Sequence, residues 1–259
     1  MTYVTLLVKI VDAAMNTPYG LPILDDCLTC ERRTAGGFCD MPDESLRLWN
    51  QVRRTSFYPR GASIFVQGQP QRDICVICVG RVKLYSTTVQ GEEIVSRICD
   101  AGEVLGLGAA MEGAEHEASA ETLEPSVISF IATSDFRRLI RNDSEIILRV
   151  ARHLSFEVRH AWDHIQMLGS HGTAPQKLAR FLLPLISSNG RVVLGLTQQE
   201  VADLLGLTRE TVSRAFADLK RRKILASRGH IIKVTNVAAL SEMTKVGDSA
   251  INGKTAGKP

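Results

Sequence analysis

The stretch that decides the fold is QQEVADLLGLTRETVSRAFA, residues 198–217. Its apolar residues stand where two short helices must pack together, at Val201, Leu205, Leu207 and Val212. Ala202 is small where the helices cross, and Gly206 permits the positive φ that a tight turn between them needs. The pattern predicts a helix-turn-helix, although a helical hairpin with a glycine turn also occurs in proteins of other functions.

The second helix of this pair begins with polar residues. Four of them, at spacings of 1, 3 and 1, share one face at its N-terminal end: Arg209, Glu210, Ser213 and Arg214. That end of a recognition helix enters the major groove of DNA. Arginine can bind guanine O6 and N7, glutamate can accept from cytosine N4, and serine can bond a base or a phosphate. Further candidates for DNA contact lie at the start of the first helix, at Thr197, Gln198 and Gln199.

The surroundings of this pair support the same interpretation. A helical stretch from Ala174 to Leu185 precedes it, and two β-type runs, residues 224–226 and 231–234, flank a Ser-Arg-Gly-His turn. Residues 173–240 contain 11 Lys and Arg against 4 Asp and Glu, a net charge of +7, whereas residues 1–172 contain 17 against 22, a net charge of −5. The total of +3 therefore conceals a basic segment suited to DNA.

Upstream, residues 57–131 consist of short β-type runs separated by Gly61, Gly68, Gly80, Gly91 and Gly102, which lie 7 to 12 residues apart. Such spacing predicts an antiparallel roll or barrel. A helical pattern then begins at Asp135, capped by Thr133 or Ser134, and continues to Gly169.

The long helical stretch carries an apolar stripe at coiled-coil spacing. Its members are Ile147, Val150, Leu154, Val158, Ala161, Ile165 and Leu168. The stripe predicts a dimerisation helix, with Arg149, Arg152, Glu157, Arg159 and Asp163 on a solvated face. Packing of the stripe on the roll is the alternative.

Length and composition set the outer limits. A chain of 259 residues suits two domains, and 44% hydrophobic with 23% charged residues is typical of a globular protein. The longest apolar stretch, Val4 to Val11, is too short to span a membrane, and the start does not resemble a signal peptide. Six cysteines are too few for a disulfide scaffold and indicate reduced thiols or ligands in a cytoplasmic protein.

We therefore expect an α+β protein with five segments. They are an N-terminal arm with a cysteine cluster (1–40), an antiparallel β-roll sensor domain of jelly-roll type (41–132), a dimerisation helix region (133–170), a winged helix-turn-helix (171–240) and a disordered tail (241–259). A hinge is expected at Gly169 to Gly172.

The glycine-punctuated roll, the long helix and the winged helix-turn-helix with LTRETVSR resemble the CRP/FNR family of bacterial transcription regulators, over residues 40–240. The resemblance implies a homodimer without catalytic activity that reads the two half-sites of a palindrome in double-stranded DNA. Glu210, Ser213 and Arg214 match the base-contacting set of the FNR branch, which implies half-sites similar to TTGAT, whereas Arg209 is similar to the CRP branch. The resemblance also implies contact with RNA polymerase, for which residues 88–92 are a candidate loop; a solvated hairpin turn is the alternative.

The family's roll binds different effectors. In members that bind cyclic AMP, an Arg-Ser pair after a Gly-Glu turn neutralises the phosphate. Here the turn Gly102–Glu103 is followed by a loop with Glu112, Glu115 and Glu117 and no arginine. Because these carboxylates would repel a phosphate, we expect no binding of cyclic AMP.

The cysteines indicate another signal. Cys27 and Cys30 are separated by two residues, and Cys39 follows after eight more. Closely spaced thiolates can turn toward one metal. FNR-type oxygen sensors hold an iron-sulfur cluster with a similar N-terminal set and a fourth cysteine in the roll, which implies a cluster labile to oxygen or nitric oxide.

Two features depart from that branch: the gap before Cys39 is longer, and the fourth cysteine aligns at about Ser129. A fourth ligand must come from Cys75, Cys78, Cys99 or a carboxylate. We favour Cys99, at a strand end beside Asp100, because cysteines within strands such as Cys75 and Cys78 are usually buried hydrophobes.

Other interpretations remain. The N-terminal cysteines can bind zinc, form a thiol-disulfide switch or be inert, and an unidentified small molecule can be the effector. Haem needs one of His116, His153, His160, His164 and His171, of which those on the long helix are expected to be exposed or at an interface. An enzyme on a cupin-like roll is disfavoured because residues 57–131 contain one histidine.

Overall fold

The computed structural model describes residues 19–22, 24, 26–31, 33, 38–169, 172–186, 190–193, 195–228 and 231–245. The chain divides into two compact units, Met1–Val158 and Arg159–Pro259. Most of the predicted arm, the centre of the predicted hinge and residues 246–259 lie outside the described residues. Within the described part, no helix has the length and apolar character needed to cross a membrane.

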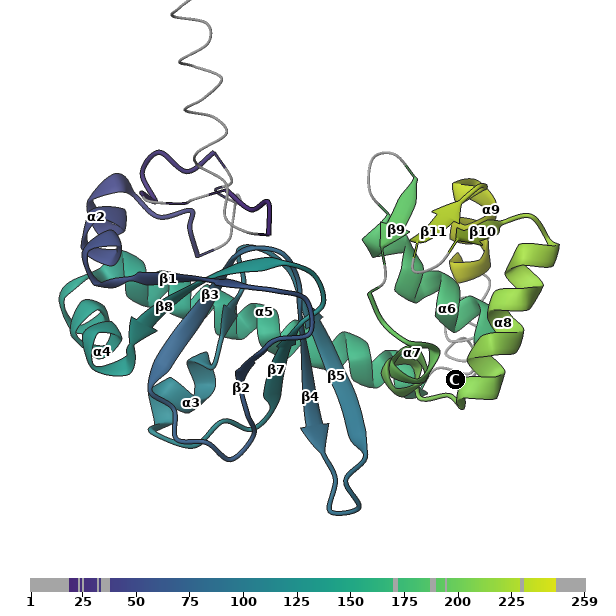
Figure 1. The fold of residues 1–259 in the computed structure, drawn as a ribbon, viewed down its shortest axis with the longest axis horizontal. Coiled ribbons are helices and arrows are strands. Elements are labelled where there is room, and N and C mark those ends of the chain that lie inside the picture. Colours follow the sequence, from purple (N-terminus) through teal and green to yellow (C-terminus); the bar gives the residue numbers. More distant parts are fainter. Residues whose placement is uncertain are drawn as a thin grey trace, which may run out of the picture. The chain divides into compact units, whose positions relative to one another are not determined.

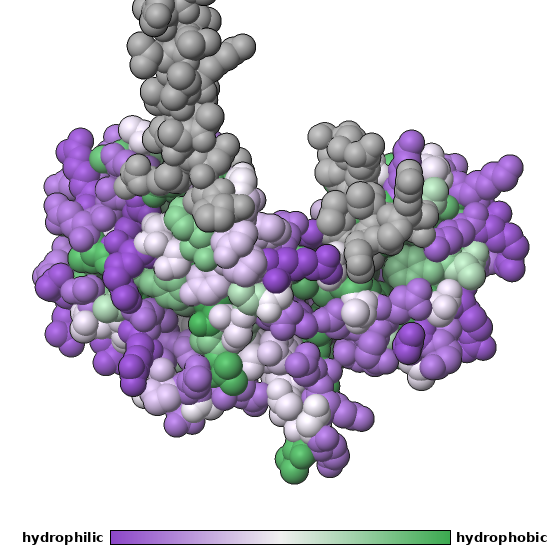
Figure 2. All heavy atoms as spheres, in the orientation of Figure 1, coloured by the Kyte–Doolittle hydropathy of each residue, from purple (hydrophilic) through white to green (hydrophobic). Residues whose placement is uncertain are grey.

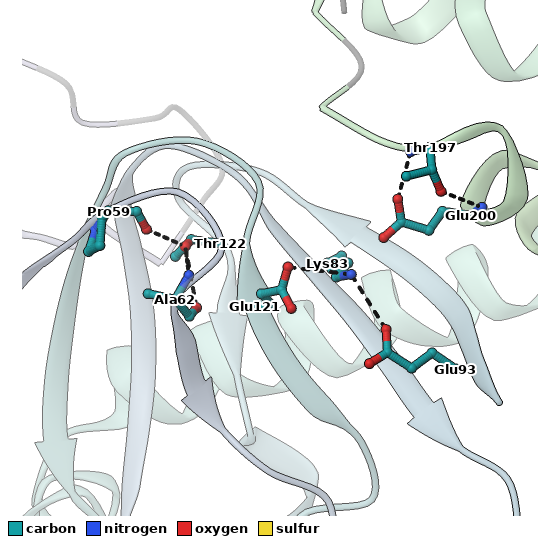
Figure 3. A network of polar contacts seen from close by, with 8 residues as sticks. All are labelled: Pro59, Ala62, Lys83, Glu93, Glu121, Thr122, Thr197 and Glu200. Carbon is teal, nitrogen blue, oxygen red and sulfur yellow. Dashed lines mark hydrogen bonds and ion pairs between the residues drawn. The ribbon is translucent and has the colours of Figure 1, made fainter. Parts of the chain in front are cut away.

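The first unit is an antiparallel roll made of two four-stranded sheets (Figure 1), as the glycine spacing predicted. One sheet has the order β1 (Arg54–Tyr58), β8 (Ser126–Ala132), β3 (Asp73–Val79) and β6 (Val104–Leu105). The other has the order β2 (Ser63–Phe65), β7 (Ser119–Thr122), β4 (Val82–Thr87) and β5 (Glu93–Cys99). In the second sheet, Lys83 is buried and pairs with Glu121 and Glu93 of the neighbouring strands (Figure 3).

Strand β3 separates two hydrophobic cores. Because side chains alternate along a strand, Ile74 and Val76 face an outer core while Cys75 and Ile77 face the inner core between the sheets. The inner core holds Cys75, Ile77, Val82, Cys99, Leu105, Ala120 and Ile128. Burial on both faces explains the continuous apolar run of this strand.

Helices cover the outer core. They are α2 (Asp43–Val52), α3 (Leu107–Glu112), α4 (Thr133–Asn142) and the first turns of α5 (Ser144–Gly169). Trp49 of α2 is buried, with its ring centroid 4.9 Å from that of Phe38 and 6.4 Å from that of Phe136. These aromatic contacts join the segment before α2 to the helix after the roll.

The predicted single helix from Asp135 to Gly169 is in fact two helices. Helix α4 begins at Thr133, and no side chain caps it. The helix is interrupted at Asp143, where the backbone is extended and the carboxylate accepts a hydrogen bond from the N–H of Glu145, 2.9 Å away. An aspartate side chain that bonds nearby backbone N–H groups competes with helix continuation, which explains the break.

The second unit is a winged helix-turn-helix, as predicted. Its helices are α6 (Ala174–Leu182), η1 (Leu183–Leu185), α7 (Gln198–Leu205), α8 (Arg209–Arg221) and α9 (Val237–Lys245). The predicted hairpin is β10 (Leu225–Arg228) with β11 (Ile231–Val234), and β9 (Arg191–Val193), which was not predicted, pairs with β11. The prediction that the disordered tail begins at residue 241 is wrong, because α9 buries Leu240 and continues to Lys245.

The apolar stripe predicted on α5 divides between two faces. Val150 is buried and Leu154 packs on the outer core, so these two serve the interior of the first unit. The exposed apolar face instead follows Leu148, Ala151, Ser155, Val158, Trp162 and Ile165, at spacings of 3, 4, 3, 4 and 3. Ile147, Ala161 and Leu168 are also exposed. Trp162, which the predicted stripe omitted, is 60% exposed.

We predict that Trp162→Glu disrupts self-association whereas Val150→Ala does not. The charge at position 162 falls on the exposed seam, where a second helix would have to bury it. Removing two methyl groups at buried Val150 lowers the free energy of unfolding by about 2 kcal/mol without touching that seam. Sedimentation velocity and thermal unfolding measure the two effects. A Trp162→Glu variant that sediments as the wild type does would contradict the assignment of this face.

Candidate DNA-reading helix and cysteine cluster

The first helix of the pair is held at both ends. At its start, the N–H of Glu200 donates to Oγ1 of Thr197 (3.2 Å), and the N–H of Thr197 donates to Oε2 of Glu200 (2.6 Å) (Figure 3). At its end, Gly206 has a φ of +60°, and a Cβ there would lie 2.7 Å from a methyl group of Leu168. The prediction of a turn with positive φ at Gly206 is confirmed.

The three candidates at the start of α7 differ in their availability to DNA. The hydroxyl of Thr197 is engaged in the capping box, and Nε2 of Gln199 donates to Oδ1 of Asp203 at 2.8 Å. Gln198 is exposed. Thr197 and Gln199 therefore have structural roles that sequence spacing did not reveal.

Helix α8 presents the predicted polar face to solvent. Val212, Ala215, Phe216 and Leu219 are buried, which leaves Arg209, Glu210, Ser213 and Arg214 exposed on the other side. Thr208 caps the helix by accepting from the N–H of Thr211, and Nη2 of Arg214 donates to Oγ1 of Thr211 at 3.3 Å. Hydrophilic residues cover much of the visible surface of this unit in Figure 2. The face thus offers two guanidinium groups, a carboxylate and a hydroxyl at the N-terminal end of a helix.

One cavity of the roll is small, and its charged lining is acidic. A cavity of about 140 Å³ is lined by Phe65, residues 106–109, residues 116–118 and Glu157. Its charged lining consists of the carboxylates of Glu117 and Glu157, and none of the described residues that line it is Lys or Arg. Glu103 of the Gly102–Glu103 turn pairs with Arg97 and accepts a hydrogen bond from the N–H of Asp100. The lining lacks the positive charge that a phosphate needs.

The three N-terminal cysteines lie beside the outer core. Cys27 and Cys39 pack against it, and the N–H of Cys27 donates to Oδ1 of Asn50 at 3.1 Å. Burial raises the pKa of Cys39 to about 11, and the nearby thiols of Cys27 and Cys30 add to the rise, against the influence of Arg33 and Arg53. The structure therefore brings these three thiols into one neighbourhood.

Cys78, not the favoured Cys99, is the roll cysteine that lies near them. Burial raises the pKa of Cys78 to about 12, and the thiols of Cys39, Cys27 and Cys30 add to the rise. Cys99 instead points into the inner core, is fully buried, and has Arg97, Glu157 and Asp100 as its charged neighbours. Cys75 is buried in the same core. The side chain of Cys99 thus lies in the inner core of the roll, which its position at a strand end did not reveal.

The four thiols are near one another but not yet arranged as ligands. In the part of the chain that the structure describes, no group of three or more His, Cys, Asp or Glu side chains is placed to hold a metal ion. Their chemistry fits an iron-sulfur cluster, since a set of four cysteine thiolates ligates both common cluster types. All six cysteines are free thiols.

The histidines have other partners. His116 is buried and stacks on Phe65, with ring centroids 3.9 Å apart, and burial lowers its pKa. Nε2 of His153 lies 3.0 Å from the carbonyl oxygen of Val104, and Nε2 of His164 lies 3.1 Å from that of Leu204. Of the two positions expected for His153, exposed or at an interface, exposure does not hold because His153 is buried; His171 lies outside the described residues.

The residues on either side of Cys39 contact α5. The ring of Phe38 lies edge-on to that of His153, with centroids 6.4 Å apart. Oδ2 of Asp40 lies 3.5 Å from Nη1 of Arg149, whose side chain is 11% exposed. Arg149 was expected on a solvated face; the sequence could not reveal its partner, which is 109 residues away.

Glu157, also expected to be solvated, is the hub of a second group of contacts. Its Oε1 lies 3.5 Å from Nη1 of Arg97 on β5 and 3.4 Å from Nε2 of His153. These contacts fix the N-terminal half of α5 to the roll.

Comparisons with known proteins agree with this architecture. A model of the cyclic nucleotide-binding domain matches residues 55–143, and a model of the Crp-like helix-turn-helix domain matches residues 176–243. The chain is 29% identical over 202 residues to the fumarate and nitrate reduction regulatory protein of Vibrio cholerae, covering 75% of this chain and 80% of that protein. It is 27% identical over 207 residues to the nitrogen fixation regulation protein FixK of Bradyrhizobium diazoefficiens, covering 77% and 86%.

The solved structure of FixK2 from Bradyrhizobium japonicum is similar to this one, with a TM-score of 0.67 and 26% identity over 74% of this chain and 97% of that chain. These relatives are regulators, not enzymes. The roll, the long helix and the winged helix-turn-helix, together with the matched domains, show that this chain is a DNA-binding transcription regulator of the CRP/FNR family.

Proposed function

We propose that this regulator acts as a homodimer that reads a palindrome with TTGAT-like half-sites. We further propose that its affinity for DNA responds to oxygen, nitric oxide or redox state through an iron-sulfur cluster held by Cys27, Cys30 and Cys39. The observation that carries the first part is the exposed polar face of α8, and the observation that carries the second is the gathering of thiols against the outer core.

The readout of DNA rests on four side chains of α8. The guanidinium groups of Arg209 and Arg214 suit guanine O6 and N7, Glu210 suits cytosine N4, and Ser213 suits a base or a phosphate. Lys220 and Arg221, exposed farther along the helix, suit phosphates, whose contacts position the protein without reading sequence. Two copies joined through the exposed face of α5 would present two such helices to the two half-sites.

The signal enters at the cysteines. A cluster bound by these cysteines would be the group that reacts with oxygen or nitric oxide. The relatives named for fumarate and nitrate reduction and for nitrogen fixation are consistent with control by the respiratory state of the cell.

The chain itself provides the route from the cysteines to the dimer helix. Phe38 packs on His153 and Asp40 pairs with Arg149, so movement of Cys39 between them shifts two contacts on α5. These contacts lie in the half of α5 that precedes the exposed seam residues Val158, Trp162 and Ile165. A bias of a few kcal/mol between two arrangements of this helix is enough to switch DNA affinity.

The β4–β5 turn is the candidate surface for RNA polymerase. It projects from the first unit in Figures 1 and 2, and Val89 in this turn is 101% exposed. We propose a cytoplasmic location for the regulator, because DNA and RNA polymerase are its proposed partners.

A small-molecule effector is the second candidate. A cavity of about 400 Å³ is lined by residues that include Arg72, Asp73, Cys75 and His116. This volume falls within the range of ligand pockets. The metal measurement below separates this candidate from the cluster.

We predict that Arg214→Ala weakens specific DNA binding by about 1–3 kcal/mol and relaxes the preference for the palindrome over random duplex, because a base contact is lost. Lys220→Ala is the matched control. Removing this phosphate contact should weaken binding to both duplexes alike and lower the salt dependence. Fluorescence anisotropy with the two duplexes at several salt concentrations measures both effects. Undiminished discrimination by Arg214→Ala would overturn the assignment of α8 as the reading helix.

We also predict that the full chain, purified without oxygen, is coloured and contains iron and acid-labile sulfide in equal amounts. Visible absorbance and analyses for iron, sulfide and zinc make the measurement. Zinc in place of iron would indicate a structural site. Colourless, metal-free protein that binds DNA would refute the cluster and favour the small-molecule effector.

A further inference from the structure

We infer that Cys78 of β3 is the fourth thiolate of the cluster site, completing the set of Cys27, Cys30 and Cys39. This inference rests on the proposed cluster and adds to it a ligand from a different strand than the one that the resemblance to the FNR branch implies. The fourth cysteine of the FNR branch aligns at about position 129, on β8, where this chain has serine. The neighbouring strand supplies the missing thiol.

The sheet topology places positions 78 and 129 next to each other. Strand β3 pairs with β8, and Ser129 lies opposite Val76, two residues before Cys78. Directly opposed residues of an antiparallel pair point to the same face, so Ser129 faces the outer core with Val76. Cys27, Cys39 and Phe38 belong to that same core.

A buried polar atom without a partner marks this face as incomplete. Ser129 is 2% exposed, and its Oγ has no hydrogen-bond partner among the described residues. In most proteins, buried polar atoms have a hydrogen-bond partner. An exception needs an explanation, such as a group that binds at that place. The orphaned hydroxyl therefore points to a ligand beside Cys78, independently of the cysteines.

The backbone at Cys78 also departs from regular pairing. The register of β3 on β8 shifts between Ile77 and Val79, so Cys78 is the extra residue of a bulge. Bulges re-aim side chains and occur next to functional sites. Here the bulge leaves Cys78 with the thiols of Cys39, Cys27 and Cys30 as its neighbours, whereas Cys75, three residues earlier, faces the inner core.

Two fixed arginines balance the charge of such a site. The guanidinium of Arg53 donates to the carbonyl oxygen of Leu24 (2.9 Å) and to Oδ1 of Asn50 (2.6 Å). That of Arg33 donates to the carbonyl oxygens of Met41 (2.8 Å) and Cys39 (3.2 Å). Both lie close enough to Cys39 to oppose the rise of its pKa. Four thiolates around a cluster carry net negative charge, which nearby guanidinium groups stabilise.

Binding of a cluster would require a rearrangement of the four thiols. Cys27, Cys30, Cys39 and Cys78 would hold a cluster as thiolates, each after losing its thiol proton. Because the described thiols are not at ligand positions as they stand, ligation would have to bring them closer together. Phe38 and Asp40 flank Cys39, so their contacts with His153 and Arg149 of α5 lie directly beside this ligand.

The test compares Cys78→Ala with Cys75→Ala and Cys99→Ala, each in the full chain purified without oxygen. We expect Cys78→Ala to retain no more than about a tenth of the wild-type iron, sulfide and visible absorbance, because one ligand of four is lost. Cys75→Ala and Cys99→Ala should retain the cluster, since both side chains belong to the inner core. A double variant, Cys78→Ala with Ser129→Cys, should regain the cluster from the adjacent strand.

Thermal unfolding of the metal-free proteins controls for loss of fold. A Cys78→Ala variant that keeps the wild-type cluster would overturn the inference while leaving the proposed function intact. Equal loss of the cluster in all three single variants would also overturn it, because core disruption would then explain the loss. Wild-type protein without iron would refute the proposed function itself and the inference with it.

Discussion

The arrangement depends on one constraint, the burial of β3 on both faces. Its side chains alternate, so they pack into the inner core of the roll on one side and into the helix-covered outer core on the other. This burial determines which core each cysteine side chain faces. Cys75 is committed to the inner core and Cys99 reaches the same core from β5, whereas Cys78 at the bulge faces the N-terminal thiols. The same outer core holds Trp49, Phe38 and the first turns of α5, so the thiols and the dimer helix share one packed interior.

Local patterns predicted the parts of the fold that local physics determines. The turn at Gly206, the exposed face of α8 and the glycine-separated strands follow from spacing and positive φ, and all are present. Contacts between distant residues could not be predicted in this way. The pairing of Asp40 with Arg149, the burial of Cys99 in the inner core and the burial of Val150 depend on which faces meet in three dimensions. A stripe at coiled-coil spacing does not reveal that Val150 and Leu154 pack inward while its other members stay exposed.

Sensing and DNA reading are linked in this account by α5. Its N-terminal half is fixed to the roll by Arg149, His153 and Glu157, and its exposed seam begins with Leu148 and continues through Trp162. In the proposed mechanism, a change at Cys39 would act on the fixed half through Phe38 and Asp40, and the seam would set the geometry of the dimer. The acidic lining of the small cavity in the roll fits a regulator whose signal is not a nucleotide.

The most direct test is the affinity of one oxygen-free sample for the palindromic duplex, measured by fluorescence anisotropy before and after exposure to air. If the cysteine site and the reading helices are coupled, affinity should change by about 5- to 150-fold, the range that couplings of a few kcal/mol produce. The same affinity in both states, in a sample shown to have lost its cluster in air, would contradict the account.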